Sequence, residues 1–498
     1  MTAMLRSILA LAGTALLAGC GLIPGYKAPP PPTETGYTPN ALPSVLSASG
    51  AGADQRFVLG EKISGSWWKL FGSSALDGVL AEAVEGNRTL AAAKANLAEA
   101  REAVAVAAGG YYPQVDFTTS AERERNNFKA VGLTGFPPKQ FNVYSLGPTA
   151  SYSFNPAGLT GKQVEQARAL EAAQNYEMEA AYLTLTGSVA TEIITVASIR
   201  AQIKAIEELL NDDAHNLRLV QDELRAGAAT DLDVETANSQ LASDRTLLPP
   251  LRQQLSTARH ALAVLVGKPP VSWSPPEIDL DALTLPAALP VSLPSALVHQ
   301  RPDILVSESQ LHAASATVGI ANAALYPEIT LSAGVMQQFL KPEAIFDPAS
   351  NIWNVGAAMA APLFHGGALR AQKRASEDAY QAALANYEQT VLQSFGQVAD
   401  LLEGLTHDAE LLAAEQTAYQ SAARALDLVR TSYGLGNSTL LQVLDAQRIF
   451  QQARIGLVRA QAQRYLDSAQ LFVAMGGGWW ERAPANATPR PASAGRSG

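Results

Sequence analysis

The chain contains two copies of one structural plan, and this internal duplication limits its fold more than any single motif does. The segment YYPQVDF at 111–117 corresponds to LYPEITL at 325–331, which lies 214 residues later. RAGAATDLDV at 225–234 corresponds to GLGNSTLLQV at 434–443, at a spacing of 209 residues. Each copy therefore repeats the same order of elements: a helix, two strands, a very long helix, a tight turn and a return helix.

The long helices are the most distinctive of these elements. Residues 159–224 contain no proline, and neither do residues 368–433. At 1.5 Å per residue, each segment would form a helix on the order of 100 Å long. Helices of this length need lateral partners, as in a coiled coil. We therefore expect long helices packed side by side rather than a compact globular core.

A tight turn should follow each long helix. In both repeats the turn contains a glycine that suits the left-handed end of a helix and a threonine that can cap the next helix. These residues are Gly227 and Thr230 in the first repeat, and Gly436 and Thr439 in the second. Return helices are expected at 231–266 and 440–475, with a kink at the Pro249-Pro250 pair.

Alternation of apolar and polar residues predicts two strands in each repeat, after a helix that in the first repeat is expected at 78–109. Val115 and Phe117 fall on one face of the first strand, and Asp116 and Thr118 fall on the other. The expected strands lie at about 112–125, 141–154, 326–340 and 352–364. Their pattern fits strands that span a membrane, with the apolar face toward lipid. Two surface hairpins on a soluble protein are the alternative.

Four strands cannot close a barrel. An open sheet edge within lipid would leave backbone N–H and C=O groups without partners. If these strands span a membrane, the chain must therefore assemble with copies of itself. Three copies of four strands would supply twelve strands and would gather the long helices into a tube.

The only cysteine, Cys20, follows a short N-terminal apolar run. This run, at 7–18, is too short to span a bilayer but has the length of a signal-peptide core. LAGC at 17–20 resembles the bacterial lipobox, which implies cleavage before Cys20 and a covalent lipid on its thiol. The residue after the cysteine is Gly21 rather than aspartate, and the sorting rule for such lipoproteins then points to the outer membrane. An ordinary signal peptide with a chance cysteine is the alternative.

These features give a domain plan for the whole chain. We expect a signal peptide at 1–19, a lipidated Pro-rich leader at 20–60 in which 24–43 serves as an extended spacer, a first repeat at 61–266, a Pro-rich connector at 267–294, a second repeat at 295–478 and a disordered tail at 479–498. The net charge of −10 indicates no basic surface for nucleic acid. No uninterrupted apolar run of membrane-spanning length follows Cys20, so any membrane span should consist of strands.

Several motifs, taken together in their order, resemble one family. They are WWKLFGSSALD at 67–77, ARHALAVLVGKPP at 258–270, LPSALVHQRPDI at 293–304, ANAALYPEITL at 321–331, SYGLGNSTLLQVLDAQR at 432–448 and MGGGW at 475–479. This order is similar to that of TolC/OprM-type outer-membrane efflux channels, in the nodulation-protein-T lipoprotein subfamily of RND-type tripartite efflux systems. The resemblance implies a homotrimer with a 12-stranded β-barrel in the outer membrane and a helical barrel crossing the periplasm. It also implies partners, an inner-membrane pump and a periplasmic adaptor, and export of small molecules.

The resemblance assigns residues near the second turn to a periplasmic constriction. Leu441 and Asp445 are four residues apart and share a helix face, with Arg448 three residues further along. Matched to the family, Leu441 and Asp445 face the channel axis, and Arg448 and Tyr433 belong to the network that holds the channel shut. A solvated Asp–Arg pair near a helix start is the alternative. The hairpin ends, at Gly227, Thr230, Gly436 and Thr439, are expected to meet the partner protein.

Other functional classes have less support. The six histidines are scattered, and no pair has metal-ligand spacing, so neither a metal site nor catalysis is expected. GLTGK at 158–162 is not a phosphate-binding loop, because Pro156 stands where the first glycine is required. A lipid-anchored periplasmic coiled-coil adaptor, or a structural envelope lipoprotein without a pore, remains the alternative to a channel. No cofactor beyond the lipid on Cys20 is expected.

Overall fold

The computed structural model describes residues 25–48, 52–126 and 139–481, which form two compact units. The first unit comprises Asn96–Gln174, Ser307–Tyr387 and the described residues up to Pro29. The second comprises Pro30–Ala95, Asn175–Val306 and the described residues from Glu388 onward. Each unit draws on both repeats, as expected if the two copies pack against each other.

The predicted duplication is visible in the order of elements. The first copy contains α2 (Ser74–Gly86), α3 (Arg88–Gly109), β2 (Gln114–Asn126), β3 (Lys139–Phe154), α4 (Leu159–Arg225), α5 (Asp231–Arg245) and α6 (Leu248–Val266). The second contains α7 (Pro294–Leu297), α8 (Pro302–Ala323), β5 (Glu328–Phe339), β6 (Asn351–Ala360), α9 (Ala368–Gly434) and α10 (Leu440–Ala474). The short 3-10 helices η5 (Pro342–Phe346) and η6 (Pro348–Ser350) connect β5 to β6. The long helices α4 and α9 have the same length, 67 residues each.

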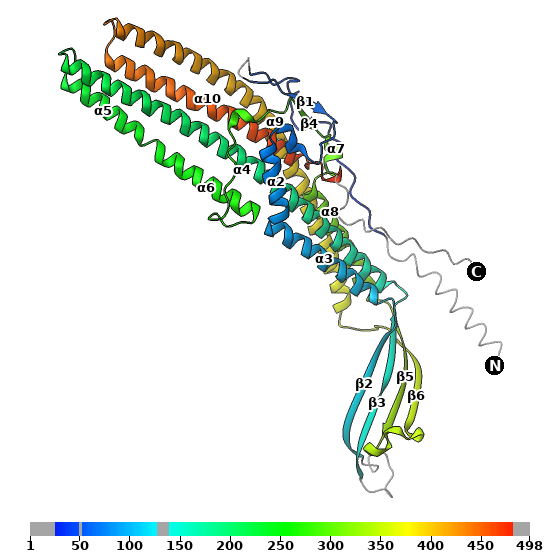
Figure 1. Cartoon of the computed structure of the whole chain (residues 1–498). Coiled ribbons are helices and arrows are strands. Elements are labelled where there is room, and N and C mark those ends of the chain that lie inside the picture. Colours follow the sequence, from blue (N-terminus) through cyan, green and yellow to red (C-terminus); the bar gives the residue numbers. More distant parts are fainter. Residues whose placement is uncertain (1–24, 49–51, 127–138, 482–498) are drawn as a thin grey trace, which may run out of the picture. The chain divides into compact units, whose positions relative to one another are not determined.

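The first unit carries an antiparallel sheet in the order β2-β3-β5-β6, and these strands lie side by side in Figure 1. One row across it joins Val115, Ala150, Ala333 and Val355, so the apolar positions of all four strands share a face. Polar pairs occupy the other face, including Ser120–Ser145 and Ser153–Thr330. The sheet therefore has one apolar face and one polar face, as the alternation of residues predicts.

Prolines set several strand ends. The strand expected at 112–125 begins only at Gln114, after Pro113, and the one expected at 326–340 begins after Pro327. The strand expected at 352–364 ends early, at Ala360, and this part of the prediction is wrong. Pro362 has no N–H to donate to a ladder, which explains why pairing does not continue.

Two predicted helices are interrupted. The helix expected at 78–109 is divided at Asn87, whose Oδ1 accepts the Leu90 N–H at 2.9 Å and thus caps α3. The helix expected at 231–266 is divided at Thr246 and Leu247, between α5 and α6. The Pro249-Pro250 pair therefore lies in the first turn of α6 instead of kinking a continuous helix, at a position where the missing N–H has no partner to lose.

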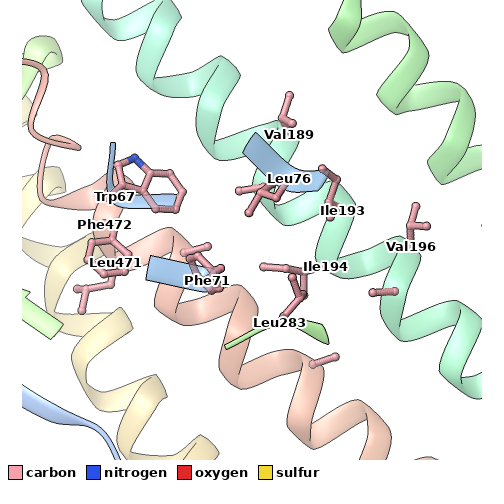
Figure 2. Close-up of a cluster of buried hydrophobic side chains, with 14 of the residues drawn as sticks. Trp67, Phe71, Leu76, Val189, Ile193, Ile194, Val196, Leu283, Leu471 and Phe472 are labelled. Carbon is pink, nitrogen blue, oxygen red and sulfur yellow. The ribbon is translucent and has the colours of Figure 1, made fainter. Parts of the chain in front are cut away.

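The core of the second unit combines the N-terminal part of the chain with the long helices. Trp67, in the 3-10 helix η2 (Trp67–Phe71), is fully buried and stacks on Phe472 of α10 with ring centroids 5.4 Å apart. Figure 2 shows these rings among side chains from α2, α4 and α10, including Leu76, Val189 and Ile193. Among the described residues, α4 is long and apolar enough to cross a membrane by composition, but 67% of its apolar window is buried. We therefore interpret that window as a packed core helix.

The leader is not a simple spacer, contrary to the prediction for its Pro-rich part at 24–43. The leader's residues from Tyr37 onward are part of the folded second unit: the Tyr37 hydroxyl donates to the Ser292 carbonyl at 2.7 Å, and Leu46 is buried. Strand β1 (Arg56–Leu59) pairs in parallel with β4 (Ala288–Val291), in a connector that also contains the 3-10 helix η4 (Leu280–Ala282). The leader's apolar residues explain this, because they bury surface that an extended spacer would expose.

The predicted start of the disordered tail is also wrong. Trp479–Glu481 forms the 3-10 helix η7, and the Trp479 indole N–H donates to the Gln300 carbonyl at 2.7 Å. The same ring meets Tyr176 edge-on with centroids 5.9 Å apart. Residues 479–481 therefore belong to the folded second unit, and the rest of the predicted tail lies outside the described residues.

Candidate channel constriction at the helix-hairpin ends

The turns after α4 and α9 have the geometry that their sequences predict. Gly227 and Gly436 adopt left-handed backbone conformations, with φ of 78° and 74°. Thr230 and Thr439 are N-caps with reciprocal capping boxes, in which the side chain three residues later accepts the cap's own N–H. These hydrogen bonds from Thr230 also lower the pKa of the Asp233 carboxyl. Both hairpin ends are therefore ordered, although their role in partner docking stays a prediction.

The first turns of α10 present a buried face and an exposed face. Leu440, Val443, Leu444 and Gln447 are buried. The predicted constriction residues lie on the other side: Leu441 is 68% exposed, and Asp445 and Arg448 are also exposed. Ile449, eight residues after Leu441 on α10, is exposed as well, so this face of α10 is a candidate contact surface in an assembly.

Asp445 and Arg448 form an ion pair within α10. The Arg448 Nη2 donates to Asp445 Oδ1 at 2.7 Å, and Nη1 donates to Gln452 at 3.4 Å. The exposed Asp445 carboxylate is thus partly neutralised by an arginine of the same helix. Such an exposed pair contributes little to stability. Within one chain, Arg448 therefore does not reach a carboxylate on another helix.

Tyr433 has a different partner from the one that the predicted network suggests. Its hydroxyl donates to Glu223 Oε2 on α4 at 2.6 Å, so it does not meet Asp445 or Arg448 within the chain. Burial, and then the hydrogen bond with Glu223, raise the pKa of the Tyr433 hydroxyl above its ordinary value. Arg430 of α9 adds a second tie, donating to Asp212 of α4 at 2.7 Å. The two hairpins are thus joined near their ends.

Sequence reasoning did not find the α4 partners Glu223 and Asp212. Both are charged residues of the long helix α4, and only the pairing of α4 with α9 distinguishes them from its other charged residues. Beneath the two ties, Val220 of α4 and Ala237 of α5 pack with Leu440 and Leu444 of α10 in a small apolar cluster. This cluster and the ties hold the ends of the two hairpins together.

A buried polar cluster lies further along the hairpins. Asp213 of α4 accepts the Gln447 side-chain amide at 2.9 Å, and Gln447 in turn accepts from Asn216 at 2.8 Å. The other carboxylate oxygen of Asp213 is buried and faces Asp244 of α5. Burial, reinforced by the facing Asp244 carboxyl, raises the pKa of Asp213 to about 7.

A second buried acid pair lies in the other hairpin. Asp408 of α9 is buried and faces Asp467 of α10. Burial and the facing carboxyl raise the pKa of Asp408 to about 7, against the opposing pull of Arg464. In both hairpins the less buried carboxyl of the pair accepts a hydrogen bond from a glutamine four residues earlier. Gln240 donates to Asp244 at 2.9 Å, and Gln463 donates to Asp467 at 3.0 Å.

The combination of a four-stranded sheet, two matched long helices and two capped hairpins can be compared with known proteins. Residues 79–268 and 293–477 match the family of outer membrane efflux proteins. The chain belongs to this family. It is an outer-membrane channel component of an efflux system, and the alternative assignments to an adaptor or to a structural envelope lipoprotein are wrong.

Individual relatives agree with this assignment along nearly the whole chain. The pyoverdine export outer membrane protein OpmQ of Pseudomonas aeruginosa is 32% identical over 470 residues, covering 93% of this chain and 96% of OpmQ. The cation efflux system protein CusC of Escherichia coli is 28% identical, covering 93% of this chain and 96% of CusC. The solved structure of the outer-membrane channel OprN superposes with a TM-score of 0.82 at 25% identity, covering 92% of this chain and all of OprN. The predicted fold class is confirmed.

In this efflux channel, the two repeats differ where the constriction is expected. Leu232 is the counterpart of Leu441 and is similarly exposed, at 74%. Thr236 takes the place of Asp445, and its hydroxyl donates back to the Leu232 carbonyl at 2.7 Å. An acidic ring would therefore receive one carboxylate from each chain, whereas apolar side chains are available from both repeats. Cys20 lies outside the described residues, and among the residues described no cluster of three His, Cys, Asp or Glu side chains could hold a metal ion.

Proposed function

We propose that this efflux channel is a homotrimer whose sheets join into one 12-stranded barrel. The observation that carries the proposal is the open sheet β2-β3-β5-β6, which has two unpaired edges and a continuous apolar face. An outer-membrane sheet with open edges would leave N–H and C=O groups unpaired in lipid, at several kcal/mol each. Pairing β2 of one chain with β6 of the next removes every edge, and threefold repetition places α4 and α9 around one axis.

The proposed channel is the exit duct of a tripartite pump. The capped ends at Gly227–Thr230 and Gly436–Thr439 are the docking sites for a periplasmic adaptor, which links the channel to an inner-membrane pump. Leu441, Asp445, Arg448 and Tyr433 form the periplasmic constriction. The support is the exposed face of α10 beside an ordered turn, together with the ties from α9 to α4.

The cargo is a small molecule selected by the pump. OpmQ is named for pyoverdine export and CusC for cation efflux, yet both are similar to this chain along its length. Channels of one fold thus serve different cargoes, as expected when selection occurs upstream. We therefore assign this chain the role of a general conduit for small molecules.

Mass and conductance test the trimer together. Purified protein in mild detergent should have the mass of about three chains and should form conducting channels in a planar bilayer, because only the closed barrel satisfies the edge groups. A monomer that inserts and conducts would overturn the proposal.

Val355→Lys, on the apolar face of β6, should abolish insertion. Asn354→Lys, the neighbouring residue on the polar face, is the matched control and should still insert.

We also propose that Cys20 carries the lipid anchor. The support is the LAGC sequence at 17–20 after an apolar run of signal-peptide length. Labelled palmitate should enter the wild-type protein and should be absent from Cys20→Ser. Equal labelling of both proteins would refute lipidation at this residue. The variant should still insert, because the barrel itself spans the membrane.

A further inference from the structure

The apolar face of the sheet has a measurable height. On β3 it extends from Phe154, beside the helices, to Tyr144, ten residues earlier in the chain. At about 3.4 Å per residue and a tilt near 45°, this span is roughly 24 Å along the membrane normal, which matches the apolar band of about 25 Å in outer-membrane barrels. Tyr144 stacks on Phe339 with ring centroids 5.6 Å apart, at the level where an aromatic girdle is expected.

Two arginines lie on the same face just beyond this aromatic row. Ala121 is paired with Tyr144, and the next positions on that face of β2 are Arg123, opposite Asn142, and Arg125, opposite Gln140. The alternation of the strand places Glu122 and Glu124 on the opposite face, toward the lumen. The end of β2 therefore separates its charges, with cations outside the barrel and carboxylates inside.

The two guanidinium groups are not neutralised by the fold. Both arginines are exposed, and neither forms an ion pair with any residue that the structure describes. The residues directly opposite them on β3, Asn142 and Gln140, are uncharged. A cation at the edge of an apolar band, without a protein partner, is suited to an anionic group in the lipid headgroup layer.

The orientation of the sheet identifies that layer. All four strands join helices at one end, because β2 follows α3, β3 precedes α4, β5 follows α8 and β6 precedes α9. Arg123 and Arg125 lie near the other end. Because the helices of an outer-membrane efflux channel extend into the periplasm, the other end faces the cell exterior. The outer leaflet there consists of lipopolysaccharide, whose lipid A carries phosphate groups.

We propose that Arg123 and Arg125 form a binding site for the phosphates of lipopolysaccharide on the outer rim of the barrel. Guanidinium groups bind phosphate oxygens with two parallel hydrogen bonds, and this geometry holds an anion more specifically than an ammonium does. The second repeat has no counterpart, since the shift of 214 residues between the repeats places Gln337 and Phe339 at the corresponding positions of β5. Each chain thus contributes one site, beside the β2 edge.

The test uses the purified channel in lipid nanodiscs, with bisphosphorylated lipid A as the probe and dephosphorylated lipid A as the reference. We compare the wild type with Arg123→Gln/Arg125→Gln and with the control Glu122→Gln/Glu124→Gln, which alters the same strand on its lumen face. Bisphosphorylated lipid A should bind the wild type and the control equally and the arginine variant at least tenfold more weakly. Dephosphorylated lipid A should bind all three proteins alike.

Two results would overturn the proposal. One is equal binding of bisphosphorylated lipid A by the wild type and the arginine variant. The other is a loss of trimer thermal stability in the arginine variant, relative to the glutamate control, when lipid A is absent. That loss would mean that the guanidinium groups pair with protein carboxylates across the chain boundary, for example with Asp347 in the connection that precedes β6 of the neighbouring chain.

Discussion

Leu441→Ala should raise the resting conductance of the channel by about twofold or more. The reason is that a ring of large apolar side chains narrows the duct and excludes water, whereas alanine removes most of that bulk. Leu441 is well placed for this role, since it is 68% exposed in the isolated chain while its neighbours Leu440 and Leu444 are buried. Single-channel recordings in planar bilayers measure the effect directly.

The chain supplies a matched control for this experiment. Leu232→Ala changes the counterpart of Leu441 in the first repeat, which is equally exposed at the start of α5. It should leave the conductance unchanged if only the second repeat narrows the duct. Equal increases in both variants would instead indicate a ring of six leucines. If neither variant changes the conductance, the constriction lies elsewhere.

The effect of charge at the proposed constriction can be measured separately from the effect of side-chain size. Asp445→Ala should lower the preference for cations, because it removes one carboxylate per chain from the proposed ring. Arg448→Ala should raise this preference, since the Arg448 guanidinium pairs with Asp445 at 2.7 Å and offsets its charge. If the pair is only a solvated surface feature, both variants will keep the wild-type selectivity and change stability by less than about 0.5 kcal/mol.

Elements with a strong period could be predicted from the sequence. The four strands follow an alternation that continues for about ten residues, and the long helices lie in segments without proline. The hairpin turns could be predicted as well, because Gly227 and Gly436 supply a left-handed conformation that other residues rarely adopt. In these cases a local rule and the tertiary structure favour the same conformation.

The features that could not be predicted from the sequence share a different cause. The interruption at Asn87 depends on a cap whose amide also donates to the Leu265 carbonyl, 178 residues away in the chain. The packing of the leader depends on pairing between β1 and β4 and on burial of Leu46. Contacts between distant segments leave no period in the sequence. The Tyr433–Glu223 tie was missed for the same reason, although Tyr433 itself was identified as a site residue.

The buried carboxyls of Asp213 and Asp408 should make the stability of the channel fall as the pH rises. The pKa of Asp213 is raised to about 7 in the folded chain, whereas an aspartate in an unfolded chain has a pKa of about 3.9. The folded state therefore holds a proton that the unfolded state has already released. This contribution is fully present below about pH 3.9 and is lost progressively as the pH rises through about 7. Asp408, in the other hairpin, should behave in the same way.

Asp213→Asn should remove much of this dependence. Asparagine resembles the protonated aspartate in shape and can still accept the Gln447 amide, so the variant should match the wild type only below about pH 3.9, and its advantage at pH 5 should be smaller than at pH 8. At pH 8 it should be more stable by at least about 1.4 kcal/mol, the equivalent of one pKa unit. Thermal unfolding of the purified channel in detergent at pH 5 and pH 8 measures the difference. Asp213→Asn/Asp408→Asn should flatten the pH profile further.

The neighbouring acid provides the control because it is the same residue type in a different environment. Asp212 is half-exposed and pairs with Arg430 at 2.7 Å, so Asp212→Asn should change stability by only a few tenths of a kcal/mol. Because the Asp212 charge adds to the raised pKa of Asp213, this variant should weaken the pH dependence slightly without removing it. If Asp213→Asn and the wild type lose stability in parallel between pH 5 and pH 8, Asp213 does not hold the proton. Opposite behaviour of the two variants at pH 8 would instead show that the burial of a carboxyl between α4 and α5, rather than the general acidity of the helices, makes the hairpins sensitive to pH.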